Sequence, residues 1–211
     1  MNNIENKRKS KVLFASITAF FAWFAILFQL YLTEGTVINF LSYFTILSNL
    51  LIALCVTFSV FLSQTKTGIF FSGISVQTAI TLYIFIVALV YNVVLRGIWI
   101  VTGWQLIVDN LLHVLNPILY ILYWLIFASK EKLSWKDGVC WTYFPLVYLI
   151  YSLIRGSVVN WYPYPFLNVT NLGYKKVLIN VSFMIVLFFI TGLLLIAINN
   201  KFRNNKYSSS K

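Results

Sequence analysis

Six long apolar runs dominate the sequence and limit what the chain can fold into. They lie near residues 12–32, 39–63, 74–99, 106–128, 139–156 and 176–198. A run of about 20 apolar residues is long enough to cross a hydrocarbon core of about 30 Å as an α-helix. We therefore predict an all-α, polytopic integral membrane protein with six transmembrane helices, which make a single transmembrane domain over residues 1–211.

The charge content supports this prediction. Charged residues make up 10% of the chain, whereas soluble domains carry roughly 25%. A basic stretch, Lys7 to Lys11, precedes the first apolar run, as in a secretory signal. The apolar run is too long for a signal peptide, and no small-residue cleavage site follows it, so we expect a retained first helix.

The basic residues predict the topology, because cytoplasmic loops carry an excess of Lys and Arg. With the N-terminus in the cytoplasm, the 16 basic residues divide into 12 on the cytoplasmic side and 4 outside, Arg96, Arg155, Lys175 and Lys176. The cytoplasmic set is Lys7, Arg8, Lys9, Lys11, Lys66, Lys130, Lys132, Lys136, Lys201, Arg203, Lys206 and Lys211. We expect a multi-pass protein of the cell membrane with both termini cytoplasmic and a disordered tail over residues 200–211.

The net charge of +11 is then mostly attraction to an anionic inner leaflet. Its short flanking clusters do not indicate nucleic-acid binding. The two cysteines, Cys55 and Cys140, are expected to be free thiols. Metal sites usually combine several His, Cys or carboxylate ligands, so one histidine and one deep carboxylate predict neither a metal nor another cofactor.

The single histidine, His113, lies inside the fourth apolar run. Titratable side chains within a membrane span are costly and mark functional sites. Asp109, His113 and Asn116 follow i, i+4, i+7 spacing and so share one helix face. If neighbouring spans alternate in direction, further polar residues fall at the same depth near the outer side. These residues are Ser42, Thr45, Ser48, Asn49, Asn92, Arg96, Asn110 and Arg155. We interpret them as a polar cavity open toward the outer leaflet.

The chemistry available there is a hydroxyl activated by a base. Thr45 or Ser42 would attack an acyl carbon while His113 accepts its proton and Asp109 or Asn110 orients the imidazole. Arg96 or Arg155 would hold a carboxylate head group. The alternative is structural: Ser, Thr and Asn side chains in spans often bond only to the backbone or bridge helices.

Three local motifs resemble the androgen-induced-gene and androgen-dependent TFPI-regulating-protein family, in its bacterial branch. They are FLSYFTILSN at 40–49, DNLLH at 109–113 with Pro117, and WYPYPFL at 161–167. The resemblance implies a multi-span threonine hydrolase of fatty acid esters of hydroxy fatty acids. It matches His113 to the essential histidine. It matches Thr45 to the nucleophile when the alignment runs on Tyr43 and Phe44, and Ser42 when it runs on Phe40 and Leu41.

The sequence thus predicts a lipid-ester hydrolase that uses Thr45 and His113, with Ser42 as the alternative nucleophile. Its partner would be a membrane lipid or lipid ester. A second hypothesis is a non-catalytic carrier or channel for a small anion or lipid head group, with Arg96, Arg155 and His113 as the binding site. A third is a structural partner in a larger membrane complex, for which changing His113 would have little effect.

Overall fold

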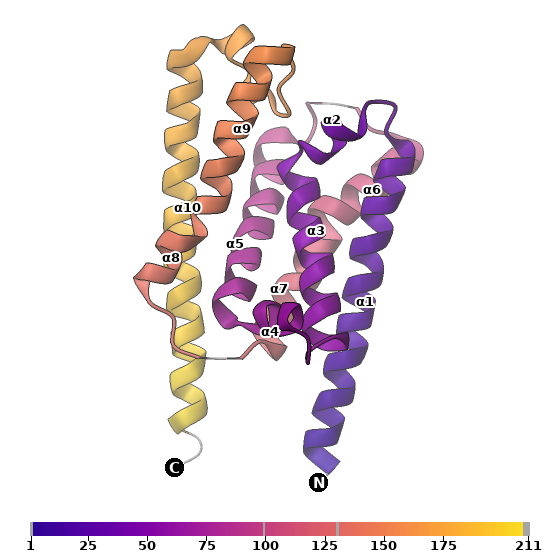
Figure 1. Ribbon diagram of the computed structural model, residues 1–211, viewed down its shortest axis with the longest axis vertical. Coiled ribbons are helices and arrows are strands. Elements are labelled where there is room, and N and C mark those ends of the chain that lie inside the picture. Colours follow the sequence, from indigo (N-terminus) through magenta and orange to yellow (C-terminus); the bar gives the residue numbers. More distant parts are fainter. Residues whose placement is uncertain (1, 99, 130, 209–211) are drawn as a thin grey trace. The chain divides into compact units, whose positions relative to one another are not determined.

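The computed structural model describes residues 2–98, 100–129 and 131–208 (Figure 1). The model is 85% helical and has no β-strand among these residues. Six helical segments are long and apolar enough to span a membrane, which confirms the predicted all-α class with six candidate spans. They are Glu5–Leu32, Phe44–Phe61, Ile74–Leu95, Gly103–Phe127, Trp135–Val159 and Val169–Asn204. Lys130 and residues 209–211 of the predicted tail lie outside the described residues.

The chain forms two compact units, Met1–Ser129 and Lys130–Lys211. In the first unit, four helices make a closed bundle: α1 (Asn2–Leu32), α3 (Phe44–Val56), α5 (Ile74–Val90) and α7 (Asn116–Phe127). Helix α1 packs against α3 and α7, and α5 packs against the same two helices from the other side (Figure 1). These helices are apolar on most of their circumference, as expected of helices that face both a bundle interior and lipid.

Two short helices complete the turns of this unit. Helix α2 (Val37–Leu41) is capped by Thr36, whose hydroxyl accepts a hydrogen bond from Asn39 N. Helix α4 (Lys66–Ser72) is capped in the same way by Thr65 and packs against η1 (Thr57–Phe61). A Cβ atom at Gly68 would lie 2.0 Å from Leu62 O. Glycine at this position therefore lets the chain after the second span turn back closely on itself.

Three segments of the bundle are π-helical, with i→i+5 hydrogen bonds: η1, η2 (Tyr91–Leu95) and η3 (Leu111–Leu115). The fourth span joins α6 (Gly103–Asn110), η3 and α7. At the end of η3, Asn116 N donates to Leu111 O, and at the end of η2, Arg96 N donates to Tyr91 O at 2.7 Å. Such π-turns displace side chains and free carbonyls, and they occur frequently at functional sites.

The second unit contains α8 (Trp135–Trp141), α9 (Tyr143–Val159), the 3₁₀ turn η4 (Pro165–Leu167) and α10 (Val169–Ser208). Helix α10 packs against α8, α9 and η4, and it is interrupted at Gly173, where φ is 71°. Asn200 anchors the segment before α8, because its Oδ1 accepts from Leu133 N and its Nδ2 donates to Leu133 O. Arg155 on α9 lies with its guanidinium carbon 4.7 Å from the centre of the Trp161 ring.

Candidate functional site

Thr45 and His113 meet inside the four-helix bundle, although 68 residues separate them. Thr45 lies in the first turn of α3, and its Oγ1 is 3.4 Å from His113 Nε2 on η3. Thr45 is 7% exposed, and the His113 side chain is 12% exposed. A hydroxyl and an imidazole nitrogen at this separation are within reach of proton transfer once the contact tightens around a substrate.

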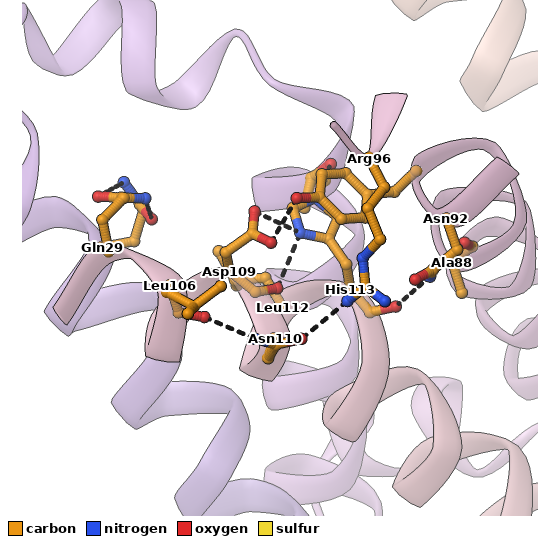
Figure 2. Close-up of polar contacts among 12 residues, drawn as sticks. Gln29, Ala88, Asn92, Arg96, Leu106, Asp109, Asn110, Leu112 and His113 are labelled. Atoms are coloured by element: carbon orange, nitrogen blue, oxygen red, sulfur yellow. Dashed lines mark hydrogen bonds and ion pairs between the residues drawn. The ribbon is translucent and has the colours of Figure 1, made fainter. Parts of the chain in front are cut away.

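Asp109 orients the imidazole from one turn earlier in the same span. His113 Nδ1 is 2.9 Å from Asp109 O and 3.2 Å from Asp109 Oδ1 (Figure 2). A backbone carbonyl can only accept a hydrogen bond, so Nδ1 carries the ring proton. In the neutral ring, Nε2 is then the unprotonated nitrogen, and it faces the Thr45 hydroxyl. The i, i+4 spacing read from the sequence thus brings Asp109 to His113 rather than to an arginine.

Tyr91 is a member of this site that sequence reasoning missed. Its ring lies parallel to the His113 ring, with the centroids 3.6 Å apart and an interplanar angle of 12°. Its hydroxyl donates to Asp109 Oδ2. One of 13 tyrosines, it lies inside an apolar run. Its position directly before Asn92, a residue of the predicted polar face, is the only signal that the sequence offers.

Pro117 explains how two asparagines come to hold the histidine segment. In a regular helix, residue 117 would donate to His113 O, but proline has no N–H. Asn92 Nδ2 donates to His113 O instead, at 3.2 Å (Figure 2). The π-turn likewise directs Asn116 N to Leu111 O, and Asn49 Nδ2 donates to Leu112 O at 3.2 Å. The carbonyls of Leu112 and His113 are therefore both paired with side chains from neighbouring helices.

Asn49 also connects Thr45 to the segment that carries His113. Its Nδ2 donates to Thr45 O at 2.9 Å, and its Oδ1 accepts from Asn116 Nδ2 at 2.8 Å. Asn49 and Asn116 are both fully buried. These hydrogen bonds join α3 at Thr45 to the segment that carries His113, and so help to set the separation of Thr45 and His113.

Arg96 and Asn110 form a polar rim next to the site. Arg96 Nη2 donates to Asn110 Oδ1 at 2.8 Å (Figure 2), and the guanidinium carbon lies 5.9 Å from the centre of the Tyr91 ring. Arg96 and Asn92 are exposed, in contrast to Asp109. The site therefore has a largely buried Thr45–His113 pair and a cationic, exposed edge.

Two residues predicted to be catalytic or to bind substrate, Ser42 and Arg155, have other contacts. Ser42 follows α2, and its Oγ donates to Ile38 O at 2.6 Å, within its own turn. Arg155 belongs to the second unit, where it stacks on Trp161. The part of the chain that the structure describes contains no group of three or more His, Cys, Asp or Glu side chains suited to a metal ion.

No family model matches the chain, and neither the curated proteins nor the solved structures contain a match. The geometry around His113 is thus the main observation from which a function can be argued.

Proposed function

We propose that this protein is an integral membrane ester hydrolase in which Thr45 is the nucleophile and His113 is the general base. The observation that supports this most directly is the chain of contacts from Thr45 Oγ1 to His113 Nε2, and from His113 Nδ1 to Asp109. A hydroxyl, a base and a carboxylate that orients the base form the arrangement used for acyl transfer on several unrelated folds.

The proposed reaction has two steps. The Thr45 oxygen bonds to the acyl carbon while its proton passes to His113 Nε2. The ester bond then breaks, and the departing alcohol takes that proton. Water repeats the sequence on the acyl-threonine and releases the acid. Asp109 stabilises the imidazolium that forms in each step.

The position of Thr45 favours the negative charge that develops on the acyl oxygen. Helix α3 begins at Phe44, so Thr45 lies where the helix dipole is positive and N–H groups point out of the helix. Preorganised dipoles in a water-poor site stabilise such an oxyanion strongly. The buried surroundings of Thr45 supply the low-polarity environment.

The substrate would be a lipid ester that enters laterally from the bilayer, the fatty acid ester of a hydroxy fatty acid being the class that the family resemblance suggests. An exposed arginine beside the reacting pair suits a substrate with a carboxylate at a distance from the ester, because arginine binds carboxylates through two parallel hydrogen bonds. The proposal includes a cell-membrane location, cytoplasmic termini and a site near the outer leaflet.

The test is labelling of the purified, detergent-solubilised protein with a fluorophosphonate probe, which reacts with activated hydroxyls. We expect the wild type and Ser42→Ala to be labelled, and Thr45→Ala and His113→Ala to be inert. Thermal unfolding of each variant provides the folding control.

Loss of labelling in Ser42→Ala with retention in Thr45→Ala would transfer the nucleophile to Ser42. A folded wild type that does not react at all would contradict the hydrolase. It would favour the second hypothesis, a carrier for a small anion.

A further inference from the structure

We infer that Tyr91 is a positioning residue for the His113 base, a role that rests on the hydrolase proposed above. Two separate contacts support it: the Tyr91 hydroxyl donates to Asp109, and the Tyr91 ring covers one face of the imidazole. Tyr91 would act through these two groups and would not itself touch the reacting atoms.

The hydroxyl contact fixes the carboxylate that orients His113. Asp109 offers Oδ2 to the Tyr91 hydroxyl and Oδ1 to His113 Nδ1. With both oxygens engaged, the carboxylate cannot rotate away from the ring. A hydrogen bond to a charged group is stronger than one between neutral groups, particularly in a buried site.

The contact between the Tyr91 ring and the imidazole acts on His113 itself. An aromatic face attracts a cation above it, and the attraction grows when both groups are shielded from water. Because Tyr91 is 9% exposed and parallel to His113 at 3.6 Å, the imidazolium that forms when Thr45 gives up its proton lies directly over this face. The stacking also prevents the ring from tilting out of line with Thr45 Oγ1.

The segment that carries Tyr91 is itself tied to the histidine. Tyr91 and Asn92 are the first two residues of η2, and Asn92 Nδ2 donates to His113 O. One π-turn thus holds the backbone of His113 through Asn92 and its side chain through Tyr91. A tyrosine that only filled space in the bundle would not need a hydroxyl aimed at Asp109.

The experiment compares Tyr91→Phe, which keeps the ring, with Tyr91→Leu, which removes the ring and the hydroxyl. The rate of fluorophosphonate labelling at saturating probe should fall about tenfold in Tyr91→Phe and about a hundredfold in Tyr91→Leu, with little change in probe affinity. Tyr123→Phe is the matched control, since it removes a fully buried phenol hydroxyl from α7 of the same bundle. It should label at the wild-type rate.

A second readout does not depend on activity. Because His113 is the only histidine, ring-labelled ¹⁵N-histidine reports this residue alone in an NMR spectrum. We expect one species in the wild type, with the proton on Nδ1, and a mixture of tautomers in Tyr91→Leu.

Wild-type labelling rates and an unchanged tautomer in Tyr91→Leu would overturn the inference. A wild type that resists the probe would instead contradict the hydrolase, while the NMR spectra would still decide whether Tyr91 positions His113.

Discussion

Two polar clusters lie in the same four-helix bundle, and they differ in whether a basic side chain faces the hydroxyl or thiol. The His113 cluster consists of Thr45, Tyr91, Asp109 and His113. The Cys55 cluster consists of Cys55, Gln77 and Tyr120 with the carbonyl of Phe71. Thr45 and Cys55 belong to the same helix, ten residues or about 15 Å apart. Both clusters are largely shielded, since the His113 side chain is 12% exposed and the other residues are buried, so burial alone does not distinguish them.

The difference lies in where the hydrogen bonds end. Cys55 Sγ donates to Phe71 O at 3.6 Å and lies 3.2 Å from the Tyr120 hydroxyl, which in turn lies 3.5 Å from Gln77 O. Gln77 Nε2 donates to the same Phe71 carbonyl at 3.0 Å. The carbonyls of Phe71 and Gln77 are acceptors in these contacts, and none of the three side chains of the Cys55 cluster is a base that could take the thiol proton. In the His113 cluster, the hydroxyl instead faces an unprotonated imidazole nitrogen. A buried hydroxyl or thiol therefore indicates a catalytic site only when a base is placed to accept its proton.

Asp109→Asn should give the largest effect. The variant keeps the backbone carbonyl that accepts from Nδ1, but it removes the negative charge that stabilises the imidazolium. We expect the labelling rate to fall roughly 10²- to 10³-fold, with the helical content unchanged by circular dichroism. Cys55→Ala is the control from the other cluster and should label normally. Equal losses in the two variants would remove the distinction between the clusters.

Tyr120→Phe should lower stability and leave the labelling rate unchanged. It deletes the hydroxyl that lies between Cys55 and Gln77, and we expect a loss of about 1–3 kcal/mol in the free energy of unfolding. The rate of labelling per folded molecule should not change. Reversible unfolding in mixed micelles gives the first quantity, and probe kinetics give the second. A slower reaction in folded Tyr120→Phe would connect the clusters functionally.

Asn92→Ala should have the smallest effect, about 1 kcal/mol of stability, because it leaves His113 O without its side-chain donor. The companion change Pro117→Ala restores a backbone N–H that can reach this carbonyl. In the double variant, loss of Asn92 should therefore cost less than in the wild-type background. Strictly additive free energies would show that Asn92 does not compensate for the proline.

Much of the fold follows from the sequence because the apolar runs are long and the bilayer thickness sets their length. The i, i+4 spacing of Asp109 and His113 placed both residues on one helix face but left open whether Asp109 contacts His113 or an arginine; in the structure it contacts His113. Thr45 and His113 were matched by depth within alternating spans, and in the structure they lie within 3.4 Å.

The remaining features depend on tertiary contacts that have no local signal. The π-turn at Leu111–Leu115 changes which carbonyls lack a backbone hydrogen bond, and no residue pattern predicts it. In the sequence, Tyr91 is only a tyrosine among apolar neighbours, and its role becomes visible only from the packing of its ring against His113 of η3. Ser42 and Thr45 have the same chemistry, and only their contacts separate them: Ser42 donates within its own turn, whereas Thr45 faces His113.

The proline after the histidine also bears on how a substrate reaches the site. Because Pro117 supplies no N–H, His113 O depends on Asn92, a residue of another span. Parting η2 from η3 would break this hydrogen bond together with the Tyr91 hydrogen bond to Asp109 and the stacking of Tyr91 on His113, at a combined cost of several kcal/mol. The seam between these two segments is thus a closed side of the bundle, and a lipid substrate of the proposed hydrolase would have to enter between other helices.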